Sequence, residues 1–263
     1  MNLFFGVWIL LLLSLPFAYV SEAGEILPVL KVESVFPLEI SVVEQGVKWE
    51  VSVPSNFNTL IGGEYNGVVG LDLNGDGVDE IIITISNGGS TPNSCVVVFF
   101  YNRESRQLSQ IEFEGESICN LKFQRGYVVS SFRDASAWSE KIYKVEGRAS
   151  KLFYFDWCVG CDETRRTDYS LEAPTSYLMS NDLEFEKRIP LEYIVTSPKA
   201  AVYEGLNDQG WTRKYLVSGD AVRVIGVEQS IDKEWKAEVK FFGRVITSGW
   251  MLCRDLGGCT VAQ

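Results

Sequence analysis

A nine-residue stretch, 72–80, carries oxygen-bearing groups at a spacing that suits a hard divalent cation. Calcium takes six or more oxygen ligands at short range, and a tight loop can turn alternate residues inward to supply them. Three acidic ligands crowded into nine residues repel one another unless a cation lies among them. The stretch therefore predicts a calcium site, and the alternative is an Asx-rich turn that binds no metal. The predicted ligands are Asp72, Asn74, Asp76, the Val78 carbonyl and Glu80, with Gly77 at the sharp turn.

The residues after this loop indicate which kind of calcium loop it is. The twelfth position, where an EF-hand loop has a bidentate Glu, is Ile83. Residues 81–85 form a β-branched run that is typical of a buried strand. The loop therefore resembles the calcium loops of integrin-type FG-GAP repeats, which also precede a strand. Without the twelfth ligand we expect a weak calcium affinity, about 10⁻⁴ to 10⁻³ M.

The rest of the first 157 residues indicates a series of strands, and these strands must position the loop. Apolar alternation and β-branched runs recur between turn-forming residues, and no segment shows a long helical stripe. This pattern predicts an all-β domain, either a sandwich or a twisted antiparallel sheet. The expected strands are 29–35, 49–53, 65–71, 81–85, 96–101, 108–113, 127–132, 142–145 and 152–155.

The amino terminus predicts export. Residues 3–20 are apolar, and small residues at 21 and 23 fit a signal-peptidase site, so we expect residues 1–23 to be a signal peptide. An uncleaved anchor is the alternative, because 18 residues is near the lower limit for crossing a bilayer. Only an uncleaved leader would place the chain at a membrane. The expected location is the bacterial periplasm or the medium, and the expected mature parts are a β domain at 24–157, a linker at 158–189 and a further domain at 190–257.

Six cysteines in an exported chain indicate disulfides, for which sequence alone allows 15 pairings. The expected hairpin formed by 96–101 and 108–113 brings the flanking Cys95 and Cys119 near each other. Proximity along the chain favours Cys253 with Cys259, which leaves Cys158 with Cys161. The last pair has the spacing of a redox motif, but the polar residues after it do not form the apolar-striped helix of that motif. We therefore expect this pair to form a structural disulfide that closes a loop.

Charge and composition exclude several functions. Residues 24–189 contain 25 acidic and 15 basic residues, a net charge of −10, whereas 190–263 contain 9 of each. An acidic module repels nucleic acid and attracts basic partners, although solubility alone also accounts for such an imbalance. The chain has no histidine, which excludes Ser-His-Asp and Cys-His mechanisms and His-ligated zinc. No carboxylate pair stands out for glycosidase chemistry, so we do not expect an enzyme.

Residues from about Trp49 to Phe155 resemble the periplasmic lysozyme inhibitors of the invertebrate-type class and their relatives with a calcium loop. The shared features are an extended lead-in, the loop before a strand, a glycine-rich loop and the strand 96–101 with its polar turn. The resemblance implies binding to a cell-wall hydrolase, and some relatives protect bacteria from wall-degrading effectors. The Ser-Gly-x-Tyr inhibitory motif of that family is absent. The residues proposed to enter the cleft of a hydrolase, which are otherwise ordinary surface and core residues, are Arg133, Asp134, Trp138 and Tyr143.

The last 70 residues resemble a bacterial SH3 domain. Gly219 and Asp220 form a turn into a strand whose inward residues alternate, and Trp235 and Trp250 begin strands of a small barrel. The resemblance implies binding to peptidoglycan peptides or to proteins, whereas a structural role for both tryptophans is the alternative. The candidate residues are Tyr203, Tyr215, Trp235 and Trp250.

Together these features predict an all-β chain in which a β domain with a calcium loop precedes an SH3-like barrel. The predicted function is that of a calcium-stabilised inhibitor or immunity-type protein acting on cell-wall hydrolases. The alternative is a peptidoglycan-binding or scaffolding module of the cell envelope with no inhibitory target.

Overall fold

The computed structural model describes residues 27–61, 63–85, 93–114, 117–134, 136–210 and 212–259. The predicted signal peptide and most of the glycine-rich loop after residue 85 lie outside these ranges. Within them the chain is nearly all β, which confirms the predicted fold class. The helical segments are short: α1 (Phe57–Leu60), η1 (Phe185–Lys187) and η2 (Cys253–Asp255). No helix of the described residues is long and apolar enough to cross a membrane.

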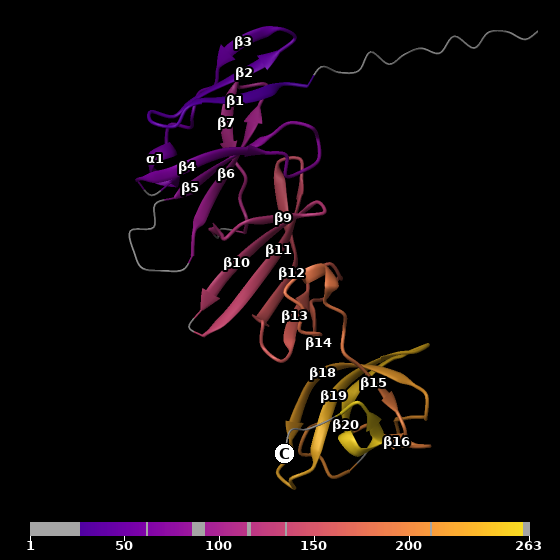
Figure 1. Cartoon of the computed structure of the whole chain (residues 1–263). Coiled ribbons are helices and arrows are strands. Elements are labelled where there is room, and N and C mark those ends of the chain that lie inside the picture. The colour runs from indigo at the N-terminus through magenta and orange to yellow at the C-terminus, as the bar shows by residue number, and fades with distance from the viewer. Residues whose placement is uncertain are drawn as a thin grey trace, which may run out of the picture.

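The strands form antiparallel sheets that follow one another in chain order along the molecule (Figure 1). The first sheet consists of β1 (Val29–Ser34), β2 (Glu39–Glu44) and β3 (Val47–Glu50). The second consists of β4 (Tyr65–Leu71), β5 (Glu80–Ile85), β6 (Cys95–Asn102) and β7 (Gln107–Gln110), with β8 (Ile118–Cys119) paired to β6. The third consists of β9 (Lys122–Gln124), β10 (Tyr127–Asp134), β11 (Ala137–Glu146), β12 (Ala149–Val159), β13 (Thr164–Asp168) and β14 (Thr175–Met179).

The second sheet is buried on both faces, because its strands contribute to two hydrophobic cores. Ile81 and Ile83 of β5 face a core shared with the first sheet, whereas Ile82 faces a core shared with the third sheet. Successive side chains of a strand point to opposite faces, so a continuous apolar run fits a strand covered on both sides. The β-branched run after the predicted calcium loop therefore occupies the middle of a three-layer arrangement.

The segment 158–189 differs from the predicted linker, because it supplies two further strands of the third sheet. Its strand β13 buries Thr164, Arg166 and Asp168 on one face. These polar side chains alternate as core residues do, but a hydropathy pattern treats them as solvated. The sequence therefore gave no apolar signal for this strand, and the polar contacts that allow its burial appear only in three dimensions.

The C-terminal part forms a curved antiparallel sheet in the order β20-β19-β18-β15-β21. Its hydrophobic core includes Val222, Val239 and Met251, and Trp235 packs against it. The strands are β15 (Glu192–Val195), β18 (Ala221–Gln229), β19 (Trp235–Phe242), β20 (Ile246–Leu252) and β21 (Leu256–Gly257), with the small pair β16 (Ala200–Ala201) and β17 (Tyr215–Leu216) beside them.

Hydrogen bonds connect the third sheet directly to the C-terminal sheet. The Leu191 backbone N–H donates to the Leu178 carbonyl at 2.9 Å, and the Leu191 carbonyl accepts from the Val224 N–H at 2.9 Å. The guanidinium of Arg223 lies 4.8 Å from the ring centroid of Tyr177. The two parts are therefore joined by backbone pairing and by side-chain contact.

The three predicted disulfides are all present: Cys95–Cys119, Cys158–Cys161 and Cys253–Cys259. Cys95 and Cys119 stand directly opposite each other in the pairing of β6 with β8. Three disulfides are typical of a chain that folds in an oxidising compartment.

Gly249 of β20 is needed for close backbone packing in the C-terminal part. A Cβ at this position would lie 2.5 Å from the Tyr203 carbonyl oxygen and 2.6 Å from a methyl carbon of Val202. We expect Gly249→Ala to lower the free energy of unfolding by about 2 kcal/mol or more, because backbone must move to make room. Urea unfolding checks this, with Gly210→Ala as control, since a Cβ on Gly210 meets nothing within 4 Å. Equal effects of the two substitutions would contradict the prediction.

Candidate metal and partner sites

The predicted calcium loop connects β4 to β5 and is closed by its own hydrogen bonds. The carboxylate of Asp72 accepts the backbone N–H of Gly75 at 2.7 Å and that of Gly77 at 2.9 Å. Gly77 has a φ of +83°, a conformation that glycine adopts without strain. The Asp72 carboxylate at the first position therefore holds the turn by two hydrogen bonds, and Gly77 at the sixth position supplies the backbone conformation that the turn needs.

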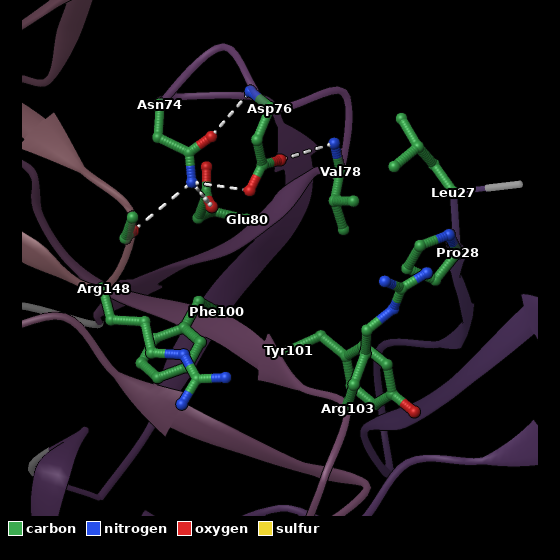
Figure 2. A pocket seen from close by; sticks show the side chains of 11 residues that line it. Leu27, Pro28, Asn74, Asp76, Val78, Glu80, Phe100, Tyr101, Arg103 and Arg148 are labelled. Atoms are coloured by element: carbon green, nitrogen blue, oxygen red, sulfur yellow. Dashed lines mark hydrogen bonds between the residues drawn. The ribbon is translucent and has the colours of Figure 1, made fainter. Parts of the chain in front are cut away.

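Asn74, Asp76 and Glu80 point toward one another inside the loop (Figure 2). The amide nitrogen of Asn74 donates to Asp76 Oδ2 at 3.1 Å, to Glu80 Oε1 at 3.0 Å and to the Gly147 carbonyl at 3.3 Å. Gly147 lies in the turn between β11 and β12, so the loop of the second sheet touches a hairpin of the third. Three oxygens from separate parts of the chain thus surround one donor group.

Glu80 is the buried acidic group of the loop, with 3% of its surface exposed. Its Oε2 accepts the Leu73 backbone N–H at 2.7 Å. Burial, together with the negative charges of Asp76 and Asp72, raises the pKa of the Glu80 carboxyl to about 7, against the lowering effect of the Leu73 hydrogen bond. The fold therefore disfavours the charged form of Glu80.

The loop contains the residue types of a cation site, and Asp76 and Glu80 converge on the side-chain nitrogen of Asn74. Carboxylate and amide oxygens are the groups that calcium prefers. Within the part of the chain that the structure describes, no cluster of three or more Asp, Glu, Cys or His side chains is placed to hold a metal. Asn74 turns its amide nitrogen toward Asp76 and Glu80, and its oxygen accepts the Asp76 backbone N–H at 2.8 Å. Both oxygens of Asp72 likewise accept backbone N–H groups. A cation at this place would need the Asn74 oxygen turned inward in place of the nitrogen.

A small cavity of about 230 Å³ opens beside the loop (Figure 2). Asn74, Asp76 and Glu80 line one part of it, and Arg148 lies across from them with its guanidinium 5.1 Å from the ring centroid of Phe100. The cavity is smaller than typical ligand pockets of 300 to 1,000 Å³. Its basic and acidic groups balance charge around the loop.

Of the four residues predicted to bind a partner, the structure brings two together and buries a third. Arg133 and Trp138 stand opposite each other in the pairing of β10 with β11, and Arg133 is exposed. Tyr143 is 1% exposed and packs edge-on against Phe113 at a centroid distance of 5.2 Å, so it is a core residue and the prediction that it enters a cleft is wrong. Its β11 alternation places it on the face opposite to Trp138. Asp134 ends β10, but its side chain lies outside the described part of the structure.

Of the aromatic residues predicted to bind a partner in the C-terminal domain, some are packed against other residues and one is well exposed. Tyr203 and Trp250 exchange backbone hydrogen bonds of 2.8 Å, and Lys236 lies 4.5 Å from the ring centroid of Tyr203. Tyr215 is 50% exposed, and Lys199 lies 4.5 Å from its ring centroid. Tyr215 is therefore the candidate that presents most of its ring to a partner.

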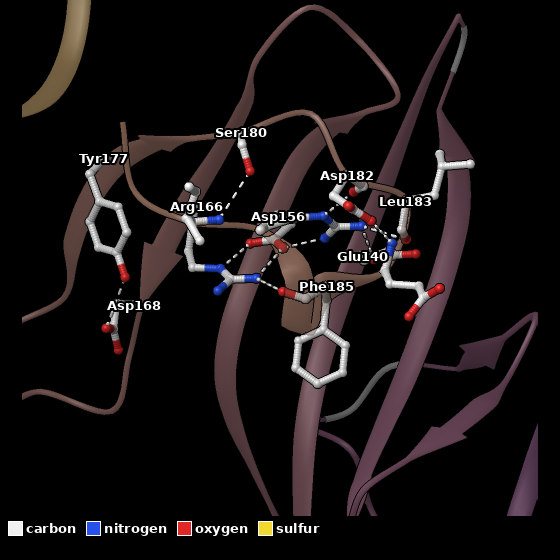
Figure 3. A network of polar contacts seen from close by, with 12 residues as sticks. Glu140, Asp156, Arg166, Asp168, Tyr177, Ser180, Asp182, Leu183 and Phe185 are labelled. Carbon is white, nitrogen blue, oxygen red and sulfur yellow. Dashed lines mark hydrogen bonds and ion pairs between the residues drawn. The ribbon is translucent and has the colours of Figure 1, made fainter. Parts of the chain in front are cut away.

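A buried ionic network, which the sequence did not reveal, crosses the third sheet (Figure 3). Both oxygens of Asp156 accept hydrogen bonds from Arg166 at 2.7 Å, and Arg188 pairs with Asp156 and, at 2.7 Å, with Glu140. The Arg188 side chain is fully buried and also donates to the Leu183 and Asp182 carbonyls. The network therefore fixes the segment 180–190 onto the face of the sheet.

No known protein-family model matches the chain, and no curated protein matches it. One solved structure aligns with it weakly. Its description is "Structure of a Xanthomonas Type IV Secretion System related protein", with 13% sequence identity and a TM-score of 0.30 over 62% of this chain and 81% of that one. A likeness at this level carries no argument about fold or function.

The only sequence signal for the ionic network is the polar alternation of β13. Arg166 faces inward between Thr164 and Asp168, but the partners Asp156, Glu140 and Arg188 come from distant positions. Charged residues are seldom buried unless they are paired, so the sequence alone predicts that each of these side chains is exposed to solvent. The network could be found only from the fold.

Proposed function

We propose that the chain is an exported, calcium-stabilised protein that binds a cell-wall hydrolase and acts as an inhibitor or immunity-type protein. The observation that carries the proposal is the pairing of two residues at the end of the β10–β11 hairpin. There Arg133 and Trp138 face each other across neighbouring strands, on a part of the chain whose net charge is −10. Arg and Trp are the residue types that most often dominate binding energy at protein interfaces.

The acidic charge supports a basic target. Hydrolases that act on an anionic wall polymer gain from positive charge, and an acidic partner would then associate faster by electrostatic steering. The resemblance to periplasmic lysozyme inhibitors supports the same class of target. The SH3-like part would then contact the same enzyme or the wall.

Calcium is proposed to bind the loop through Asp72, Asn74, Asp76, the Val78 carbonyl and Glu80. A bound dication would offset the repulsion between the loop carboxylates. Asn74 already contacts the Gly147 carbonyl in the β11–β12 turn, so ordering the loop would also hold two sheets together. The cation would thus stabilise the module that carries Arg133 and Trp138.

The test is an inhibition assay on a panel of cell-wall hydrolases, including invertebrate-type lysozymes, in millimolar calcium. We expect inhibition of at least one enzyme, and a loss of about tenfold or more in affinity for Arg133→Ala and Trp138→Ala, as interface anchors show. Trp157→Ala is the matched control, because Trp157 is another tryptophan of the third sheet, is 50% exposed and belongs to β12. No inhibition or binding of any panel enzyme would contradict the proposal.

Calcium should also change how stability depends on pH. Glu80 holds its proton more tightly in the folded chain, since its pKa rises from 4.5 to about 7. In chelator, the stability due to this group is therefore complete below about pH 4.5 and is lost as the pH rises through 7. With about 10 mM calcium we expect about 1.4 to 2.7 kcal/mol of stabilisation at pH 8, from the affinity expected above.

Thermal melts of the wild type and Glu80→Gln, each with calcium and with chelator, check this expectation. The neutral glutamine should remove the pH-dependent difference between pH 5 and 7.5 in chelator. It should also weaken the response to calcium. A melting temperature that does not respond to calcium at pH 8 would contradict the proposed cation site.

A peptidoglycan-binding or scaffolding module is the second candidate function, and exposed Tyr215 with Lys199 beside it favours it. Sedimentation of the full chain with purified peptidoglycan discriminates the two. Binding that Tyr215→Ala removes, together with no inhibited hydrolase, would support this second function.

A further inference from the structure

A second cavity, of about 420 Å³, lies on the third sheet at the end of the β10–β11 hairpin. Its floor includes Ser131 of β10 and Glu140 of β11, which pair across the strands. Farther along the same face, Val129 and Ile142 are covered by Phe185. The cavity thus lies where the segment that carries Phe185 leaves the sheet face open. Its volume falls in the range of small-molecule pockets.

The polar part of the lining offers both donors and acceptors without a dominant charge. It combines an amide, an ammonium, hydroxyls and a carboxylate, from Asn120, Lys122, Ser131, Ser136 and Glu140. Lys122 Nζ lies 3.7 Å from Glu140 Oε1, and Ser131 donates to the same oxygen at 3.1 Å. Glu140 is held from behind by buried Arg188. Glu140 and Ser131 are therefore fixed before any ligand arrives, which favours selective hydrogen bonding.

The apolar part of the lining is compact and includes one aromatic side chain. Trp138 and Val159, which pair across β11 and β12, lie with Leu183, whose surface is 72% exposed. The Cys158–Cys161 disulfide closes the turn beside Val159, and Cys161 also lines the cavity. An aromatic surface and a small apolar corner therefore border the polar groups.

These features match the chemistry of an acetamido sugar. A sugar ring has one apolar C–H face that packs on an aromatic surface, and hydroxyls around its edge that need paired donors and acceptors. Its acetamido methyl needs a small apolar corner, and the neutral ring needs no excess charge. A purely apolar ligand would leave the polar lining unpaired, and a phosphate ligand would meet the carboxylate of Glu140.

We propose that this cavity binds an N-acetylated amino sugar of a glycan chain, the class of sugar found in bacterial cell walls. Trp138 packs against the ring, and Val159 and Leu183 surround the acetyl methyl. Lys122 donates to polar groups of the sugar, and oxygens of Glu140 and Asn120 accept from them, since both Asn120 side-chain N–H groups are bonded to Asn93 and Ser131. The site acts without a hydrolase and without calcium. It shares Trp138 with the proposed hydrolase-binding surface, so it is tested in the absence of any hydrolase.

The test is a calorimetric and NMR titration of the full chain with a β-1,4-linked trimer of N-acetylglucosamine, up to millimolar concentration. The corresponding trimer of glucose is the matched ligand that lacks the acetamido groups. We expect binding of the acetylated trimer, with binding of the glucose trimer weaker by about tenfold, since a methyl pocket and an amide contact are both lost. NMR shifts should concentrate at β9 to β11.

Two variants locate the site. Trp138→Ala should weaken binding by about tenfold or more, as removal of a stacking aromatic does, and Lys122→Met should weaken it while leaving thermal stability unchanged, since the Lys122 side chain is half exposed. Trp157→Ala should bind as the wild type does, because Trp157 does not line this cavity. A chain that binds neither trimer overturns the proposal, and so does binding that survives Trp138→Ala. Loss of hydrolase binding in Trp138→Ala without any glycan binding would assign the cavity to a protein side chain instead.

Discussion

Replacing Arg188 by methionine is expected to lower the free energy of unfolding by about 3 to 5 kcal/mol, the range for removing one partner of a buried ion pair. Arg188 is fully buried and pairs with both Asp156 and Glu140. Without the Arg188 guanidinium, Glu140 keeps the Ser131 hydroxyl and the half-exposed Lys122, whose Nζ is 3.7 Å away. Methionine has a similar length and no charge, and Asp156 keeps Arg166, so the loss comes chiefly from the poorly compensated carboxylate of Glu140 rather than from a large cavity.

Urea unfolding of Arg188→Met and of Lys187→Met separates this effect from a general loss of charge. Lys187 is the neighbouring residue, and its pair with Glu184 is exposed on both sides. Exposed pairs contribute about 0 to 1 kcal/mol, so Lys187→Met should change stability by less than that. If Arg188→Met lowers stability by under 1 kcal/mol, the network is not what fixes the segment 180–190.

Removing the Cys95–Cys119 disulfide by a double substitution to alanine is expected to cost about 3.5 kcal/mol. The loss of unfolded-state entropy grows with the length of the closed loop, and this bridge spans a sequence separation of 24. The same relation gives about 2 kcal/mol for Cys253–Cys259 and about 1.5 kcal/mol for Cys158–Cys161, with separations of 6 and 3.

Three double-alanine variants compared by denaturant unfolding test this order, and each serves as a control for the others. Cys95 and Cys119 also join β6 to β8, so their removal should loosen that pairing first in hydrogen exchange. If the Cys158–Cys161 variant is the least stable of the three, native contacts rather than loop length determine the contribution of each bridge.

The parts of the fold that the sequence predicts are those with local signals. The run 81–83 is apolar at every position, and the structure buries it on both faces. The three disulfides follow from short separations and from one hairpin register. The turn at Asp72 and Gly77 follows from residue types that favour it locally.

The parts that the sequence misses depend on distant partners. Strand β13 is buried through charges that pair with Asp156, which no local pattern reveals. The resemblance predicts a binding role for Tyr143, yet its strand alternation places it in the core with Phe113. The cavity at Trp138 needs the disulfide turn and Leu183 to form its walls, and these come from a segment that was expected to be a linker.

The backbone pairing of Leu191 with Leu178 and Val224 replaces the expected tether between the two halves of the chain. A flexible tether would let the C-terminal domain search a wide volume for a second site on its target. Hydrogen-bonded strands set the spacing between Trp138 and Tyr215 instead. Bivalent attachment then gains avidity only on a target whose two sites match that spacing, so geometry as well as surface chemistry selects the target.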